Sequence, residues 1–238
     1  MFFYNEEDGQ SAILGDGWNL QLRQTWEPTD TDHIAAGNIG TRIRGGTTSV
    51  VNHSSLSNSI SFAGEKAYYI NYRHSAYDHQ KMWANTPELI STSQSTAVSI
   101  RVLVRDINSY GHWFIMFRTP NGGTYESGYY FGNDYGNLVA TGLGTIQSMA
   151  PNNVWKWYRA DLTPQFQNGV WVNDKLEYYI ADAAEDPQWN LLGQTFQTNI
   201  SWNNSTYKYN MLRWFDHSTT GTNKILWIDN LEFYTKEV

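Results

Sequence analysis

Apolar and polar residues alternate in the stretch Ala97-Val98-Ser99-Ile100-Arg101-Val102-Leu103-Val104-Arg105. Successive side chains of a strand point to opposite faces, so this alternation sorts the stretch into two sets. The apolar set is Val98, Ile100, Val102 and Val104, and the polar set is Ser99, Arg101 and Arg105. The pattern predicts an antiparallel strand with one face in a core and the other face in solvent.

Similar strand patterns recur along the chain. The stretch His112-Trp113-Phe114-Ile115-Met116-Phe117-Arg118 is apolar on both faces with polar ends, which predicts a central strand. Further strands are expected near 125–132, 137–142, 154–162, 207–215 and 224–234. The stretch 169–180 is expected to be a hairpin that turns at Asn173-Asp174. The best helical candidate is the short stretch 181–186, which Pro187 would stop.

Many short strands with regular turns are typical of two packed antiparallel sheets. The chain has 238 residues, a length that one β-sandwich can use in full. No linker or internal repeat interrupts the pattern. We therefore expect a single domain over residues 1–238.

The composition excludes several classes of function. The net charge is −7 and no basic stripe is present, so nucleic acid is a poor candidate partner, and an anionic ligand would have to be held by local Arg and Lys. The chain has no cysteine, which excludes disulfides and thiolate metal sites. No apolar run approaches transmembrane length, so no membrane partner is expected. A composition this rich in Asn, Ser, Thr and Gly indicates a secreted protein, which we expect to be a monomer.

Three parts of the chain carry a resemblance to a known family. They are Phe3-Tyr4-Asn5-Glu6-Glu7-Asp8-Gly9 followed by Gly17-Trp18, then Trp171-Val172-Asn173-Asp174-Lys175-Leu176, and finally Trp227-Ile228-Asp229-Asn230-Leu231-Glu232-Phe233-Tyr234. With these segments the chain resembles the concanavalin A-like jelly rolls, which include laminin-G-like modules, carbohydrate-binding modules and several polysaccharide lyases. The resemblance implies an all-β fold, a two-sheet antiparallel β-sandwich in which the first and last strands pair.

The resemblance also implies a structural calcium ion. Pairing of the terminal strands would bring Glu6 and Asp8 near Asp229, and carboxylates gathered in this way suit Ca²⁺, which takes six to eight oxygen ligands. We therefore expect these three residues to hold Ca²⁺. The alternative is that they are ordinary turn and strand-end residues. No organic cofactor is expected.

The run 68–83 is unusually rich in Tyr, Arg, His, Asn, Gln and Trp, and this mixture suggests a carbohydrate groove. Because side chains alternate along a strand, placing Ile70 in the core puts Tyr69, Asn71 and Arg73 on the opposite face. The same reasoning directs His112 and Arg118 outward from their strand. It also groups Tyr209 with Arg213. We expect Asn71, Arg73, His112, Tyr209 and Arg213 to meet on one concave sheet.

These residue types suit β-elimination on a uronate polymer. Arg73 and Asn71 would neutralise the carboxylate, and Arg213 would bind the adjacent sugar. His112 or Tyr209 would take the C5 proton, Tyr209 would protonate the leaving oxygen, and His79 is a reserve base. The expected substrate-binding residues are Tyr69, Trp83, Arg118 and Trp214.

This inventory resembles that of jelly-roll lyases acting on glucuronan or alginate, although the Arg-x-Glu-Leu-Arg and Tyr-Phe-Lys-Ala-Gly motifs of the commonest alginate lyases are absent. The first hypothesis is therefore a polysaccharide lyase that cleaves a β-1,4-linked uronate polymer without a metal. A carbohydrate-binding or lectin-like module with the same groove is the alternative. A jelly-roll glycoside hydrolase is a third possibility, disfavoured because the acids are not paired on one strand.

Overall fold

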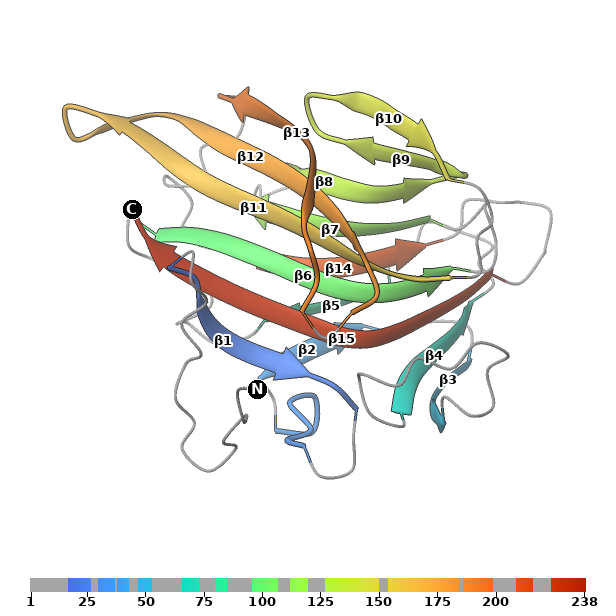
Figure 1. The fold of residues 1–238 in the computed structure, drawn as a ribbon. Helices are drawn as coiled ribbons and strands as arrows, with labels where there is room; N and C mark the ends of the chain where they lie inside the picture. The colour runs from blue at the N-terminus through green and yellow to red at the C-terminus, as the bar shows by residue number, and fades with distance from the viewer. Residues whose placement is uncertain are drawn as a thin grey trace.

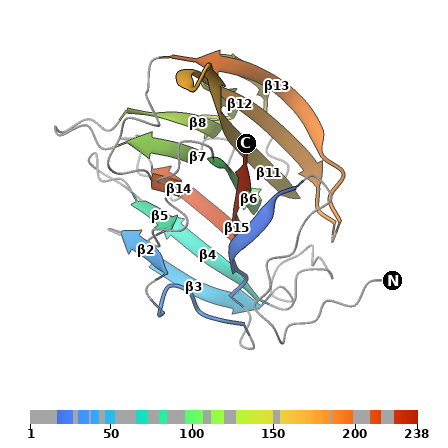
Figure 2. The same ribbon diagram turned by 90° about the vertical axis from the view of Figure 1, so that its left-hand side faces the viewer.

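A computed structural model describes residues 17–26, 30–36, 38–42, 47–52, 66–72, 80–84, 96–106, 112–119, 127–149, 154–184, 186–198, 209–215 and 224–238. These residues form two antiparallel sheets and no helix, which confirms the all-β sandwich (Figures 1 and 2). Sheet A contains β1 (Asn19–Gln24), β3 (Thr47–Asn52), β4 (Lys66–Tyr72), β6 (Thr96–Asp106), β11 (Trp155–Gln167), β12 (Val170–Asp182), β13 (Asn190–Gln197) and β15 (Lys224–Glu237). Sheet B contains β2 (Ile39–Arg42), β5 (Gln80–Ala84), β7 (His112–Thr119), β8 (Ser127–Asp134), β9 (Asn137–Ala140), β10 (Gly144–Ser148) and β14 (Tyr209–Phe215).

The strand order decides which residues can share a surface. Sheet A runs β13-β12-β11-β6-β15-β4-β3, with β1 also paired to β15, and sheet B runs β10-β9-β8-β7-β14-β5-β2. Figure 2 shows the sheets as two layers, with β8, β7, β14, β5 and β2 on one side of the sandwich. The central position of β7, between β8 and β14, is the one expected from its apolar faces.

The core lies between the two layers. Alternate residues of β6 and β7 contribute to one buried cluster, among them Val102, Trp113 and Phe117. The apolar set of β6 is buried in this cluster as expected. Its polar set was expected in solvent, and that expectation is wrong: Ser99, Arg101 and Arg105 are also buried. Strand β6 is therefore covered on both faces.

The β11–β12 hairpin turns earlier than expected. The turn residues are Asn168 and Gly169, with φ of 52° and 76°, and Asn173 and Asp174 lie inside β12. An Asn-Gly pair favours the left-handed conformation that a two-residue hairpin turn requires, so Asn168-Gly169 was the stronger turn signal. Asp174 is fully buried instead, where it accepts hydrogen bonds from the Tyr129 hydroxyl and the Trp171 indole, both at 2.9 Å. The bond to Tyr129 joins the two sheets.

Residues 181–184 and 186 do not adopt the helix considered from sequence. Ala181 and Asp182 are the last residues of β12, where they pair with Trp157 and Lys156 of β11. The hairpin partner therefore determines the conformation of these residues more strongly than their local helix propensity. In the part of the chain that the structure describes, no helix has the length and hydrophobicity to cross a membrane.

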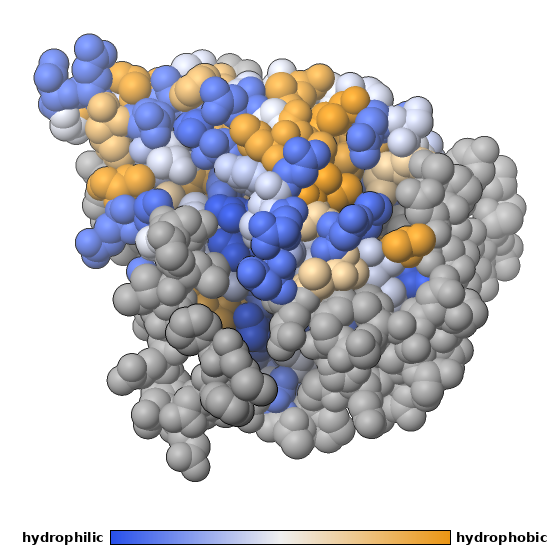
Figure 3. Space-filling model, in the orientation of Figure 1, coloured by the Kyte–Doolittle hydropathy of each residue, from blue (hydrophilic) through white to orange (hydrophobic). Residues whose placement is uncertain are grey.

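At one edge of the sandwich, an apolar side chain connects the two sheets. The β9–β10 hairpin of sheet B lies against β13 of sheet A, where the Leu143 side chain packs on Gly193. Figure 3 shows hydrophobic residues gathered on the surface in the upper half of the view, where β13 and this hairpin lie in Figure 1. Leu143, Leu191 and Phe196 are among the exposed large hydrophobic residues of this region.

The first described strand and the last strand pair, as expected. β1 runs antiparallel to β15, with Leu22 opposite Phe233 and Arg23 opposite Glu232. On its other side β15 pairs with β6, and the register shifts between Ile228 and Leu231. This irregularity contains Asp229 and Asn230, which the register between β15 and β6 skips.

We expect His33 to make the free energy of unfolding depend on pH. Its backbone N–H donates to Gln24 Oε1 at 2.9 Å, and its ring Nδ1 lies 3.0 Å from Asn38 Nδ2. Burial lowers the pKa of His33 below 6.5, against the opposing influence of Asp32 and Asp30. The unfolded chain therefore binds a proton first as the pH falls through 6.5, so the free energy of unfolding decreases over that range.

Replacement of His33 by Gln is expected to flatten this part of the pH profile. Urea midpoints measured from pH 8 down to pH 5 for both proteins would test it. A decline of equal steepness in the His33→Gln variant would show that other groups cause the acid sensitivity.

Candidate functional site

Sheet B has one face against the core and one face directed away from it. On β7 the core side carries Trp113, Ile115 and Phe117, which belong to the buried cluster. Phe114 and Met116 lie on the other side. Tyr130 of β8 lies opposite Met116 in the register and is 38% exposed. We call this side the sheet B face and define it by the positions of Phe114, Met116, Tyr130 and those directly opposite them on the neighbouring strands.

Strand β14 extends the sheet B face. In its antiparallel register with β7, Tyr209 lies opposite Arg118, and Arg213 lies opposite Phe114. Phe215 lies opposite His112. Directly opposed residues of an antiparallel pair occupy the same face, so these positions join Phe114 on the sheet B face. Four of the residues expected in the groove therefore occupy positions on one face of sheet B, namely His112, Arg118, Tyr209 and Arg213.

Basic positions form a row across three adjacent strands of this face. Arg213 of β14 lies opposite Lys81 of β5, and Lys81 lies opposite Arg42 of β2. Neighbouring strands are about 4.8 Å apart, so the three positions follow one another closely. Like charges placed directly opposite each other destabilise a sheet. The register thus brings three basic residues to adjacent positions on sheet B.

Aromatic and sulfur-containing residues occupy the parallel row. Tyr130, Met116, Met211 and Trp83 follow one another across β8, β7, β14 and β5. The rings of Phe114 and Tyr130 meet edge to face, with centroids 5.7 Å apart. Beside Phe114 stands Gly132, whose position cannot hold a Cβ because the Trp113 carbonyl oxygen would be only 2.1 Å away. The face thus combines ring surfaces with basic positions, and Trp83 is on it as expected.

Asn71 and Tyr69 do not lie on this face. Both belong to β4, a strand of sheet A, where Asn71 is opposite Ile225 and Tyr69 is opposite Trp227. Tyr68 faces the core, so the sequence analysis was correct in placing Tyr69 and Asn71 on the face of β4 that points away from the core. The expectation that β4 lies beside β7 and β14 in one sheet was wrong, because the chain places β4 next to β15. Asn71 and Tyr209 are therefore on opposite sides of the sandwich and cannot share one groove.

Trp214 is also misplaced by the sequence analysis. The register sets it opposite Trp113, which is fully buried, so its position is on the core side of β14. The alternation of β14 requires this, because Arg213 is on the sheet B face. Arg73, His79, Glu6 and Asp8 lie outside the described residues.

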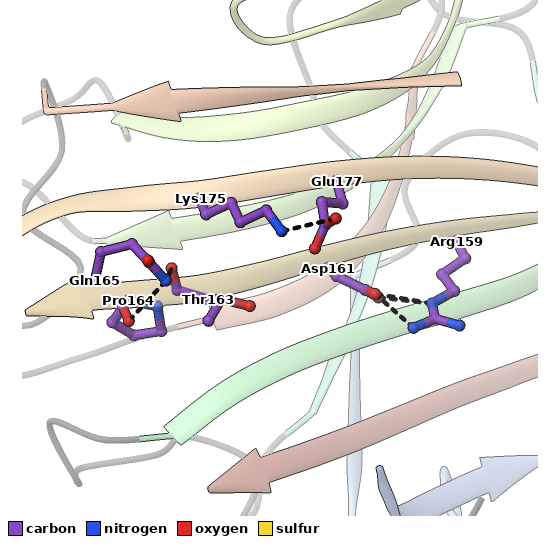
Figure 4. A network of polar contacts seen from close by, with 7 residues as sticks. All are labelled: Arg159, Asp161, Thr163, Pro164, Gln165, Lys175 and Glu177. Carbon is purple, nitrogen blue, oxygen red and sulfur yellow. Dashed lines mark hydrogen bonds and ion pairs between the residues drawn. The ribbon is translucent and has the colours of Figure 1, made fainter. Parts of the chain in front are cut away.

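Sheet A carries a second polar cluster that the sequence analysis did not find. Arg159 of β11 lies opposite Arg101 of β6, and Arg101 lies opposite Glu232 of β15. All three are buried, as is Asp161, two residues along β11 from Arg159. Arg159 Nη2 is 2.6 Å from Asp161 Oδ2, and its Nε is 2.9 Å from each carboxylate oxygen. Figure 4 shows this pair beside the Lys175–Glu177 pair, whose atoms are 2.9 Å apart.

Aromatic rings surround these arginines. The Arg159 guanidinium carbon is 4.8 Å from the Tyr179 ring centre and 5.6 Å from that of Trp189. Burial, with Asp161 and Glu177 nearby, raises the pKa of Tyr179 to about 12. Tyr179 therefore keeps its proton near neutral pH and can donate a hydrogen bond but is a poor general base. The signal in the sequence was the spacing Arg159-x-Asp161 shortly after Trp155 and Trp157, which places opposite charges on the same face of a strand.

Asp229 is the one expected calcium ligand that the structure describes. Its side chain is fully buried at the irregularity of β15. A buried carboxylate suits a cation, and Glu6 and Asp8 would be the further ligands. No group of three or more His, Asp or Glu residues within the described ranges is arranged to hold a metal ion. The calcium site stays a prediction.

Comparisons with known proteins give distant structural likenesses. No family model and no curated protein matches the chain. A crystal structure of a protein of unknown function from Shewanella oneidensis MR-1 matches with a TM-score of 0.46 and 18% identity, over 84% of this chain and 79% of that one.

Botulinum neurotoxin structures match at a similar level. One belongs to a study that found type C cell entry dependent on two ganglioside molecules, and it gives a TM-score of 0.46 and 14% identity over 81% of this chain. The serotype D/C binding domain gives a TM-score of 0.44 and 14% identity over the same share. The chain spans 44% of the length of each of these neurotoxin chains.

Proposed function

We propose that the protein binds an acidic polysaccharide on the sheet B face. The observation that supports the proposal is the row of basic positions Arg213, Lys81 and Arg42 on three neighbouring strands. The chain as a whole has a net charge of −7, whereas this row consists of three positively charged residues. Charged groups arranged in this way attract an anion at short range and impose an orientation on it.

The aromatic row gives the proposed ligand its second contact. A sugar ring presents an apolar face of C–H groups, and flat aromatic side chains cover such surfaces well. Tyr130 is accessible to a ligand, and Trp83 occupies a position in the same row. The basic row would hold the carboxylates of successive units while the aromatic row covers their rings.

Uronate elimination is a second candidate function of the same face. It is favoured by the register, which places Tyr209 directly opposite Arg118 and on the same side as Arg213. Arg118 or Arg213 would neutralise the uronate carboxylate in place of Asn71, which is on the opposite side of the sandwich. Tyr209 would take the C5 proton and protonate the leaving oxygen, and His112 is at the far end of β7.

One set of polysaccharides distinguishes binding alone from elimination. The protein is incubated with glucuronan, alginate and a neutral glucan, and both binding and the ultraviolet absorbance of unsaturated uronate ends are followed. We expect binding to the acidic polymers that weakens with added salt, since screening reduces charge contacts. A rise in absorbance that Tyr209→Phe abolishes would establish elimination. Equal affinity for the neutral glucan would contradict the proposed role of the basic row.

A further inference from the structure

Arg101 is a buried cation whose acidic neighbours already form contacts with other side chains. Its side chain belongs to a residue that is only 5% exposed, on the face of sheet A that points away from the core. Its Nε and Nη2 atoms are buried and donate no hydrogen bond within the described part of the chain. A buried charge with unsatisfied donors is strongly unfavourable, which suggests that another group accepts those bonds.

The two acids whose charges act on Arg101, Asp161 and Glu232, are already held by other groups. Asp161 is held by Arg159 through three contacts of 2.6 to 2.9 Å. Glu232 is held on one oxygen by Arg23 Nε at 2.8 Å and on the other by the Tyr234 hydroxyl at 2.7 Å. Among the described residues, these contacts pair Asp161 with Arg159 and Glu232 with Arg23, and they leave the Nε and Nη2 donors of Arg101 without an acceptor. Desolvation and the neighbouring Arg159 accordingly lower the pKa of Arg101.

The surroundings of Arg101 are shaped by aromatic rings. The Arg101 guanidinium carbon is 4.0 Å from the Tyr234 ring centre and 5.6 Å from that of Trp189. Trp18 lies beside Arg159, at 5.7 Å from its guanidinium carbon. Trp189 lies outside the strands, in the connection between β12 and β13, and is half-buried. The centre of the Trp189 ring lies 5.6 Å from both guanidinium carbons, so this ring borders the two cations.

We propose that Arg101, together with the neighbouring Arg159, binds one oxyanion of a small ligand at a site separate from the sheet B face. The bound group is a carboxylate, phosphate or sulfate, whose oxygen atoms accept the hydrogen bonds that Arg101 Nε and Nη2 do not make. Guanidinium groups present paired N–H donors that fit such oxyanions. The site differs from the sheet B face in place, because it lies on sheet A and is formed by a compact buried cluster.

Binding at this site would stabilise the folded protein, since the unfolded chain does not contain the cluster. The melting temperature is measured against increasing phosphate, sulfate and glucuronate at constant ionic strength, with chloride as the compensating salt. We expect a saturable rise of about 5 °C at a hundredfold excess over the dissociation constant. The comparison of the three ligands distinguishes a free inorganic anion from a sugar acid.

Two variants show whether Arg101 causes the rise in melting temperature. Arg101→Gln should lose the saturable rise, and Lys175→Gln, which removes a paired cation from the same face, should retain it. Should Arg101→Gln fail to fold, the ¹⁵Nε–¹H signal of Arg101 in the unaltered protein must shift with the same saturation curve. A melting temperature that does not respond to any oxyanion would show that water satisfies Arg101, and a response retained by Arg101→Gln would place the anion elsewhere. Either result overturns the proposal.

Discussion

Asp161→Asn should lower the free energy of unfolding by about 3–5 kcal/mol, one of the two largest effects that we expect in this protein. The carboxylate of Asp161 is buried and neutralises Arg159, which lies opposite Arg101 in the sheet A register. With an amide in its place, two guanidinium groups would stand next to each other without a compensating charge. Urea denaturation at pH 7 measures the loss directly.

The matched control is Asp182→Asn. Asp182 Oδ1 also forms an ion pair, at 2.8 Å from Lys156 Nζ, but its side chain is 92% exposed. Exposed pairs contribute about 0.2–1 kcal/mol, so this variant should remain close to the unaltered protein. Equal losses in the two variants would mean that burial of the Arg159–Asp161 pair has no energetic consequence.

Trp113→Ala should destabilise the fold by about 3–5 kcal/mol, because it removes a large ring from the centre of the core. Trp113 is fully buried in β7, and its ring meets that of Tyr158 of the opposite sheet edge to face, with centroids 4.6 Å apart. The substitution would remove this contact between the layers and leave a cavity beneath the sheet B face. Thermal and urea unfolding should both report the loss.

Val170→Ala serves as the comparison for the core. Val170 is 66% exposed at the start of β12, next to the hairpin turn. A surface substitution of this kind should change stability by less than about 0.5 kcal/mol. A Trp113→Ala variant as stable as Val170→Ala would show that the two sheets are not held together by the cluster described above.

Much of the fold followed from local patterns. The alternation in β6 and the two apolar faces of β7 are properties of single strands, and the structure confirms the core positions of both. The hairpin turn was placed wrongly because Asn173-Asp174 was given more weight than Asn168-Gly169, whose positive φ angles match the stronger turn signal. The burial of Arg101 and Arg105 was missed because alternation alone does not reveal whether a second layer of side chains covers the polar face.

The candidate site was predictable only within a single sheet. Side chains alternate between the two faces of a strand, and this rule assigned the residues of β7 and β14 to the correct faces. His112, Arg118, Tyr209 and Arg213 accordingly occupy positions on one face. No local pattern reveals which strands become neighbours, and for that reason β4 was assigned to the wrong sheet together with Asn71. Lys81 and Arg42 were missed for the same reason, since their relation to Arg213 exists only through the pairing of β14, β5 and β2.

The most direct test of the proposed function is the affinity of Arg213→Gln for an acidic polysaccharide, compared with that of Lys156→Gln. Each variant removes one positive charge, the first on the sheet B face and the second on sheet A, where Lys156 pairs with Asp182. Loss of a charged contact at the ligand predicts an affinity lower by about tenfold to a hundredfold for Arg213→Gln, and no change for Lys156→Gln. Unchanged binding by Arg213→Gln, or equal weakening of both variants, would contradict the account.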